Sequence, residues 1–188
     1  MSTLIYSTAL FDLPYLQEEN CTWKTLELPK YTLHQVSCNG SVEAIRQIVG
    51  LKKDVNEEDE HGYAPLYYAA KNRRTKTVRL LLEQGAEVNA QGGYYGTALQ
   101  AAILSRSTEI IRILLDHGAE VNVQGGYYGT ALQAAVHRRT TEKFRILLDH
   151  GAEVSAQGGE YGESTEIIQI LLDHGADVNA QGGQNGTA

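Results

Sequence analysis

The sequence is poor in cysteine, proline, methionine and tryptophan. Its 188 residues include only two cysteines, three prolines, one methionine and one tryptophan. Cys21 and Cys38 are too few to form a disulfide framework in a chain of this length, so we expect reduced thiols in a reducing compartment. The predicted location is the cytoplasm, with the nucleus as the alternative.

Long apolar runs are also missing. No stretch approaches the roughly eighteen apolar residues of a membrane-spanning helix, and residues 1–14 lack the basic and apolar regions of a secretory signal. We therefore expect no membrane partner.

The motifs of common catalytic and cofactor sites are absent too. The sequence has no HExxH, no G-x-S-x-G, no GxxxxGK[ST] and no cysteine-rich metal spacing. Three Asp-His pairs do occur, at 116–117, 149–150 and 173–174. Because they recur with the repeat described below and precede a glycine, we interpret each histidine as a helix-ending residue. The sequence predicts neither an enzyme nor a cofactor or metal site.

Positive charge is scarce relative to negative charge. There are 16 Lys and Arg against 23 Asp and Glu, a net charge of -7. This balance repels polyanions at long range, so a nucleic-acid partner is disfavoured and a protein or peptide partner is expected.

What the sequence does contain is a repeat. GAEVNAQGGYYGTALQAA begins at Gly85, GAEVNVQGGYYGTALQAA begins at Gly118, and GAEVSAQGGEYG begins at Gly151, which gives two steps of 33 residues. Counting back by the same step from Leu66 reaches Leu33. Self-similarity at this period indicates stacked structural units.

Each unit is predicted to be two helices followed by an extended loop. Thr97 is suited to cap a short helix, which a polar break near Ser105 separates from a second, very apolar helix around 110–115. Gly118 can end that helix in the left-handed conformation, and the Gly-Gly-Tyr-Tyr-Gly run favours a hairpin-like loop. Such a pair cannot bury its apolar faces alone, so neighbouring units must stack.

These residues resemble the ankyrin repeat, a 33-residue unit with a T-P-L-H-x-A-A opening and a G-A-D-V-N close. The openings are Ala64-Pro65-Leu66-Tyr67-Tyr68-Ala69-Ala70, Thr97-Ala98-Leu99-Gln100 and Thr130-Ala131-Leu132-Gln133. The closes begin at Gly85, Gly118, Gly151 and Gly175. The resemblance covers about residues 31 to 188 and implies an all-α solenoid of stacked helix-turn-helix units that works as a non-catalytic protein-interaction module or scaffold.

The motif histidine of that family is kept only at His34. It is replaced by Tyr67, Gln100 and Gln133 in the later units. Because glutamine both donates and accepts hydrogen bonds, we expect a substitute network rather than a loss. The Gln-Gly-Gly loops are similar to ankyrin arrays of fungal NACHT-ankyrin proteins, although no nucleotide-binding motif is present.

The predicted organisation has four parts. Residues 1–30 are an N-terminal extension or cap, 31–63 a degenerate repeat, 64–162 three full repeats and 163–188 a truncated repeat. The truncated repeat lacks the nine residues equivalent to 130–138, which form the first helix. We expect this uncapped end to be the least stable part of the array, and self-association through it is one alternative.

The first predicted binding surface is formed by the loop tips and the inner helices. Tyrosine recurs at the tips, where it suits an interface, although stacking of the rings along the array is the alternative. The tip residues are Tyr94, Tyr95, Tyr127, Tyr128 and Tyr161. The family resemblance adds the concave face of the inner helices, namely Gln100, Ala101, Leu104, Gln133, Ala134 and His137.

The second predicted surface is an arginine column. Arg73, Arg106 and Arg139 recur at 33-residue spacing in the turn between the two helices. Such a row could pair with an acidic or phosphorylated partner, and a solvated polar turn is the alternative. Taken together, the sequence predicts a protein-binding module; the alternatives are a transcriptional co-regulator and a fragment of a NACHT-ankyrin receptor-like protein.

Overall fold

The computed structural model describes residues 32–51, 53–93, 96–105, 107–138 and 140–153. The chain divides into two units between Lys30 and Tyr31, and all described residues belong to the second. The N-terminal extension at 1–30 and the truncated repeat at 163–188 lie outside the described residues.

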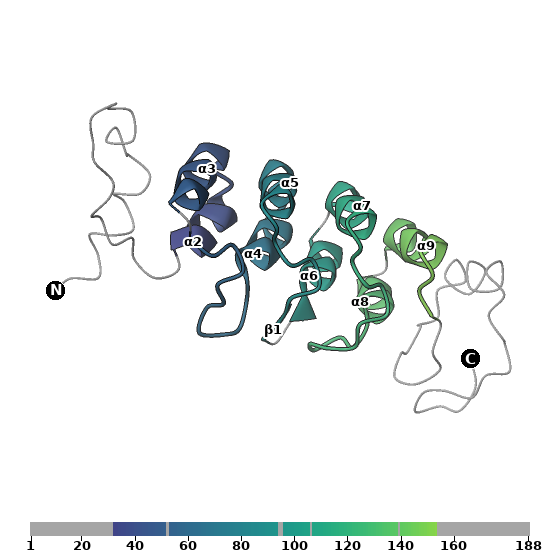
Figure 1. The fold of residues 1–188 in the computed structure, drawn as a ribbon. Coiled ribbons are helices and arrows are strands. Elements are labelled where there is room, and N and C mark those ends of the chain that lie inside the picture. The colour runs from purple at the N-terminus through teal and green to yellow at the C-terminus, as the bar shows by residue number, and fades with distance from the viewer. Residues whose placement is uncertain (1–31, 52, 94–95, 106, 139, 154–188) are drawn as a thin grey trace, which may run out of the picture. The chain divides into compact units, whose positions relative to one another are not determined.

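The described residues form eight helices and one very short hairpin, in an order that repeats the pair of helices four times (Figure 1). The elements are α2 (Thr32–Asn39), α3 (Val42–Gly50), α4 (Pro65–Lys71), α5 (Thr75–Glu83), β1 (Gln91–Gly92), β2 (Gly96–Thr97), α6 (Ala98–Leu104), α7 (Thr108–Asp116), α8 (Ala131–His137) and α9 (Thr141–Asp149). The predicted all-α repeat fold is confirmed.

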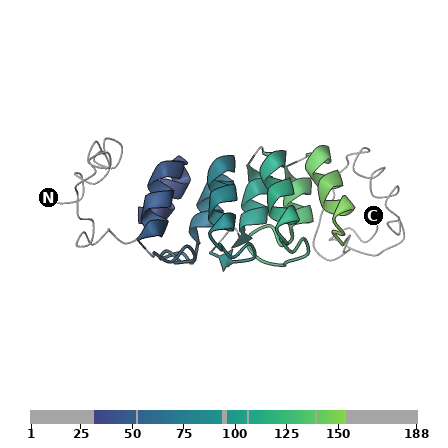
Figure 2. The same cartoon turned by 45° about the horizontal axis from the view of Figure 1, so that its top comes forward.

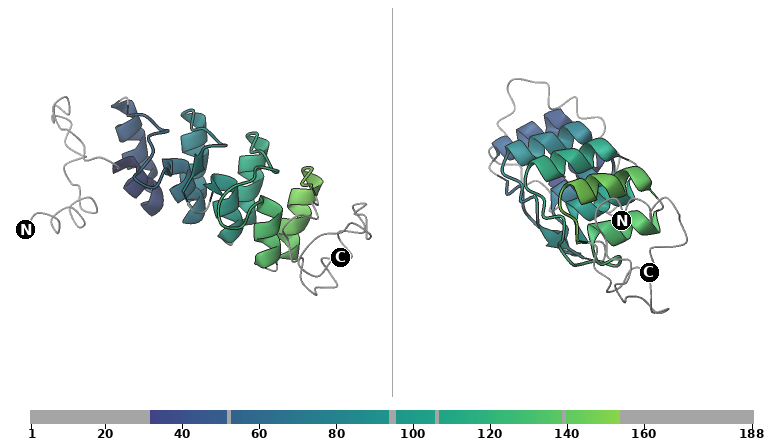
Figure 3. Two further views of the ribbon diagram at one scale, coloured as in Figure 1. Left: turned by 90° about the horizontal axis from the view of Figure 1, so that it is seen from below. Right: turned by 90° about the vertical axis from the view of Figure 1, so that its right-hand side faces the viewer.

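The helices are arranged in two rows. The inner helices α2, α4, α6 and α8 pack against one another in sequence order, and the outer helices α3, α5, α7 and α9 form the second row beside them (Figure 3). Because the two helices of a pair run in opposite directions, the short turns lie at one edge of the stack and the long loops at the other (Figure 2).

The core follows the sequence period. Leu33, Leu66, Leu99 and Leu132, the residues that define the 33-residue step, are exposed by only 3%, 1%, 1% and 2%. Each inner-helix leucine is therefore a core residue in its own unit, and the register extends into the degenerate first repeat. No helix within the described ranges is long and apolar enough to cross a membrane.

The start of helix α6 shows why it begins at Ala98. The Thr97 hydroxyl accepts a hydrogen bond from the amide of Gln100, while the Gln100 side-chain oxygen accepts one from the amide of Thr97 at 2.8 Å. This reciprocal capping box satisfies two amides that the first helical turn leaves without partners. Thr130 and Gln133 repeat it at the start of α8. The predicted capping role of Thr97 is confirmed.

The outer helices α5, α7 and α9 end at glycines with positive φ, namely Gly85, Gly118 and Gly151. Gly118 has φ 84°, and the amide of Ala119 donates to the carbonyl of Leu114 at 2.9 Å, while the Gly118 amide donates to Leu115 at 3.0 Å. These two bonds define a Schellman ending, which needs a left-handed residue at the position of the glycine. The helix-ending role of the preceding histidine is also confirmed, because His117 Nδ1 lies 2.7 Å from the carbonyl oxygen of Ile113.

Candidate protein-binding edge

Asparagines bind consecutive units together along the loop edge. The side chain of Asn89 donates to the carbonyl of Gly118 at 3.1 Å and accepts from the amide of Glu120 at 2.8 Å. The same pair of bonds occurs one unit earlier, from Asn56 to Gly85 and Glu87, and one unit later, from Asn122 to Gly151 and Glu153. Each asparagine therefore fixes the end of the following outer helix, which sets the spacing of the loops.

The loops themselves pack backbone against backbone. In the second loop, which joins α5 to α6, β1 and β2 pair antiparallel with Gln91 opposite Thr97, as the predicted hairpin requires. A Cβ atom on Gly92 would collide with the carbonyl of Gly62 and lie 2.9 Å from the Cα of Tyr63 in the preceding loop. Only glycine permits this approach at position 92, whereas a Cβ atom on the equivalent Gly125 would make only an ordinary contact with Gln91 Oε1 at 3.6 Å.

Gln100 supports the third loop, which joins α7 to α8. Its Nε2 donates to the carbonyl of Gly125 at 3.0 Å and to that of Gly129 at 2.6 Å, and the amide of Gly125 donates to Gly129 at 2.9 Å. One buried side chain thus bridges both ends of the loop that carries Tyr127 and Tyr128. The predicted substitution of glutamine for the motif histidine is confirmed at Gln100, because His34 Nε2 contacts the carbonyl of Tyr63 at 3.0 Å in the same way.

This geometry corrects the role assigned to the inner-helix residues. Gln100 is exposed by only 3%, and Ala101 and Ala134 by 1% and 0%, so these side chains are packed inside the array and cannot contact a partner. The reason is that the loops and the adjacent inner helices cover these three positions. Leu104 is half-buried, and the His137 side chain lies outside the described part of the structure. Gln133 is half-buried, in the second capping box.

The tyrosines at the third loop tip are placed differently. Tyr127 is 62% exposed, and its ring lies edge-on to that of Tyr128, with centroids 4.9 Å apart. Tyr128 is half-buried. Among the described residues, Gln124 and Gly126 of the same loop are exposed and uncharged, and so is Gln91, whose Oε1 lies 3.6 Å from the position of a Cβ atom on Gly125. Tyr94, Tyr95 and Tyr161 lie outside the described residues.

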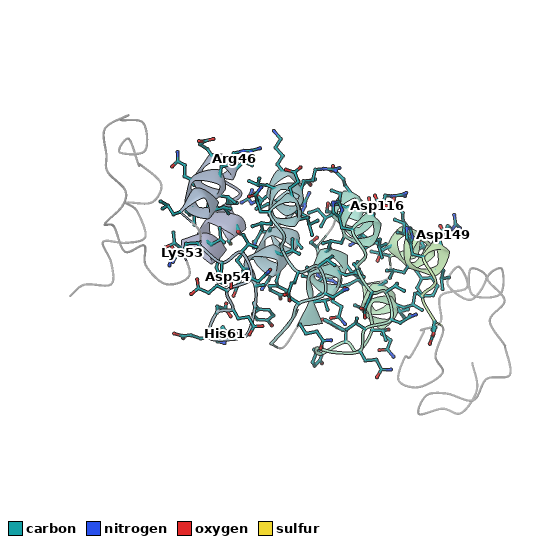
Figure 4. The ribbon with its side chains drawn as sticks, viewed as in Figure 1. Arg46, Lys53, Asp54, His61, Asp116 and Asp149 are labelled. Carbon is teal, nitrogen blue, oxygen red and sulfur yellow. The ribbon has the colours of Figure 1, made fainter. Side chains whose placement is uncertain are left out.

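The first loop has a different chemistry. Its tip carries exposed Glu58, Glu60 and His61, and His61 lies at the outer end of the loop in Figure 4. Beneath it, Asp59 accepts hydrogen bonds from the amides of His61 and Tyr63 at 2.8 and 3.0 Å and from the hydroxyl of Tyr68 at 2.5 Å. The acidic surface is therefore held on a rigid turn.

Burial opposes ionisation of Asp59, but the hydrogen bonds from Tyr68, Tyr63 and His61 outweigh it and hold the pKa of this carboxyl below its usual value. Burial, together with the same bond to Asp59, raises the pKa of the Tyr68 hydroxyl above its usual range. The sequence did not predict this pair, since only the fold brings the two side chains together.

A buried aromatic cluster supports the first loop. Tyr63 stacks on Tyr67 with centroids 4.0 Å apart, and Tyr68 lies edge-on to Tyr67 at 5.5 Å and to His34 at 5.9 Å. Tyr67, which replaces the motif histidine, thus packs against its own loop through ring contact. The signal in the sequence was the run of tyrosines around Pro65, which periodicity alone did not explain.

The sequence also did not predict the burial of Lys143. It occupies the position of Ile110 in the preceding unit, yet it is 5% exposed, and its Nζ donates to the carbonyl of Ile103 at 2.6 Å and to that of Ser105. It therefore satisfies carbonyls at the end of α6. A charged residue at a repeat position that holds Ala44, Thr77 and Ile110 in the earlier units was the available signal.

Only one residue of the predicted arginine column belongs to the described part of the chain. Arg73 is exposed, in the turn between α4 and α5, while Arg106 and Arg139 lie outside the described residues. Asp116 and Asp149, at the ends of α7 and α9, mark the opposite, acidic end of the outer helices (Figure 4).

Within the described residues, no group of three or more His, Cys, Asp or Glu side chains could hold a metal ion.

Paired helices at a fixed period, an asparagine ladder and stacked loops define a helical repeat protein. The family described as ankyrin repeats (3 copies) matches the chain over residues 10–92 and 90–158. The chain belongs to this family, whose members are generally protein-interaction modules and typically non-catalytic. No curated protein matches the chain.

Proposed function

We propose that this protein binds a partner protein through its loop edge, with Tyr127 at the centre of the contact. The observation that carries the proposal is the 62% exposure of Tyr127 at the tip of a loop whose two ends are bridged by Gln100. Tyrosine is enriched at interfaces because it offers a large contact area with few rotatable bonds and one polar end.

The support of this loop also favours binding. The Gly125–Gly129 hydrogen bond and the two bonds from Gln100 fix the backbone before any partner arrives. A fixed loop loses little conformational entropy on association, so more of the contact energy appears as affinity. The uncharged rim formed by Gln91, Gln124 and Gly126 suits an uncharged surface on the partner.

The experiment is quantitative affinity purification from matched extracts with the wild-type chain and two variants. Tyr127→Ala removes the exposed ring, and Glu142→Ala removes an exposed side chain of α9 at the opposite edge. We expect at least one protein to be enriched by the wild-type and Glu142→Ala chains and reduced about tenfold with Tyr127→Ala, in keeping with the loss of an interface hot spot. Equal enrichment by all three chains would contradict the proposal.

We place this activity in the cytoplasm, with the nucleus as the alternative. The low cysteine content supports a reducing compartment. Microscopy of a tagged chain tests this location: a signal confined to a secretory organelle would contradict it.

A further inference from the structure

The turn between α4 and α5 is a concentrated basic surface on an acidic protein. Residues 71–76 read Lys-Asn-Arg-Arg-Thr-Lys, and all four basic side chains are exposed in a chain of net charge -7. The turn lies at the edge of the stack opposite the loops, because it joins the other ends of the antiparallel helices (Figure 2). A ligand of this turn would therefore not meet Tyr127.

Arg74 is held in a defined position on this surface. Its Nε donates to the carbonyl of Cys38 in the preceding unit at 2.9 Å, and its side chain lies across Gly40, where a Cβ atom would be only 2.6 Å from the Arg74 Cδ. The bond engages Nε rather than the terminal guanidinium nitrogens, and the Arg74 side chain as a whole is exposed. An arginine that is already ordered loses less entropy when it binds a carboxylate or phosphate.

Lys76 stands where the other units have an acidic residue. It is the second residue of α5, and the second residues of α3, α7 and α9 are Glu43, Glu109 and Glu142. Acidic side chains favour the amino-terminal end of a helix, and a lysine there is unfavourable. Helix stability therefore does not explain Lys76.

Arg73 is likewise unfavourable for the fold. Its φ is 61°, in the left-handed region, and it is the only non-glycine residue with positive φ among the described residues. The equivalent residue of the first unit, Gly40, has φ 85°. A glycine would satisfy this turn without the steric cost, so the stability of the turn does not explain the exposed arginine.

These three cations are also not neutralised by the described part of the chain. The ion pair found there joins Arg79 to Glu109 at 3.6 Å, and no described acidic side chain pairs with Arg73, Arg74 or Lys76. Glu109 is further engaged by the hydroxyl of Thr75 at 3.5 Å. The positive charge of the turn is thus available to an external anion.

We propose that Arg73, Arg74 and Lys76 form a second binding surface that takes an anionic peptide segment of a partner, with clustered carboxylate or phosphate groups. Arginine guanidinium groups pair with both anions through two parallel hydrogen bonds. A long polyanion such as nucleic acid fits less well, because Glu43 and Glu109 flank the turn and the net charge is negative.

The test uses fluorescence anisotropy with the full chain and two labelled peptides, Glu-Glu-phosphoSer-Glu-Glu and Glu-Glu-Glu-Glu-Glu. The test variant combines Arg73→Gly with Lys76→Glu, two residue types that other units of this chain carry at these positions. Arg145→Glu on α9 is the control, because it also reverses one exposed basic charge. We expect binding by the wild type, about a tenfold loss in the test variant and a change below about twofold in the control.

Three outcomes would overturn the proposal. They are no peptide binding by the wild type, an equal loss in Arg145→Glu, and tighter binding of a single-stranded oligonucleotide of the same charge than of either peptide. The ratio of the two peptide affinities assigns the surface to phosphate or to carboxylate groups. Tyr127→Ala should leave peptide binding unchanged, so this surface and the loop edge succeed or fail separately.

Discussion

The side-chain Nε2 of Gln100 donates a hydrogen bond to the carbonyl oxygen of Gly129, 29 residues further along the chain, at 2.6 Å. His34 and Tyr63 stand in the same relation, also 29 residues apart, at 3.0 Å. Histidine in one unit and glutamine in another thus make the same kind of hydrogen bond from an inner helix to the next loop. Histidine and glutamine both provide a buried donor at this position, whereas Tyr67, at the same position of the second unit, packs against Tyr63 through ring contact.

Replacing Gln100 with alanine is expected to destabilise the protein by roughly 2–3 kcal/mol, because two loop carbonyls and one helix amide lose their partner. Gln100→His should cost less, since a histidine serves the same loop at His34. The free energy of unfolding in urea measures both effects. If the two variants were equally unstable, the equivalence of the two contacts would be wrong.

The asparagine ladder predicts a second stability effect. Asn89→Ala removes a donor to Gly118 and an acceptor for Glu120, and we expect a loss of about 1–2 kcal/mol. Asn89→Asp keeps the acceptor and should lose less. The matched control is Asn39→Ala, an exposed residue at the end of α2. Thermal unfolding of the three variants ranks them, and an equal effect of Asn39→Ala would reject the ladder as a stabilising feature.

Thr77 provides a stabilising prediction. Its hydroxyl is fully buried and makes no hydrogen bond within the described residues, whereas Ile110 occupies the equivalent position of the next unit. Removing a buried polar group that lacks a partner should stabilise the fold, by about 1 kcal/mol for Thr77→Val. Thr141→Val, at a half-buried hydroxyl, is the control. If Thr77→Val unfolded at a lower urea concentration than the wild type, the Thr77 hydroxyl would have to have a hydrogen-bond partner.

The Asp59–Tyr68 pair predicts a pH effect. The pKa of Asp59 is lowered in the folded state, so its contribution to stability is complete above the unfolded pKa of about 3.9 and is lost as the pH falls through the lower, folded pKa. Tyr68→Phe removes one of the stabilising hydrogen bonds and should raise the pKa of Asp59 towards its usual value. Carboxyl titration by NMR measures the shift.

The accompanying change in stability checks the same pair. A smaller difference between the folded and unfolded pKa of Asp59 weakens the pH dependence of the free energy of unfolding. Between about pH 4 and 2, the free energy of unfolding of Tyr68→Phe should therefore fall less with decreasing pH than that of the wild type. Identical acid-unfolding profiles and an unchanged Asp59 pKa would show that the amides of His61 and Tyr63 alone set the shift.

The sequence alone determined the repeat, its register and its local signals. A 33-residue period in apolar residues, glycines and a capping threonine depends on neighbours close in the chain, so Leu33, Thr97 and Gly118 could be assigned correctly from their spacing. Each makes its structural contribution mainly within its own unit, where helix geometry fixes which residues meet.

Only the tertiary structure decided which side chains are exposed. Gln100 lies on an inner helix that the sequence predicted to be open, but stacking of the next loop covers it, and so it became a support for Tyr127 rather than a contact. The hydrogen bond between Asp59 and Tyr68 and the burial of Lys143 likewise arise from packing between a helix and a loop or a neighbouring unit. Exposure depends on what residues about 30 positions away place on top of a side chain, which a local pattern does not encode.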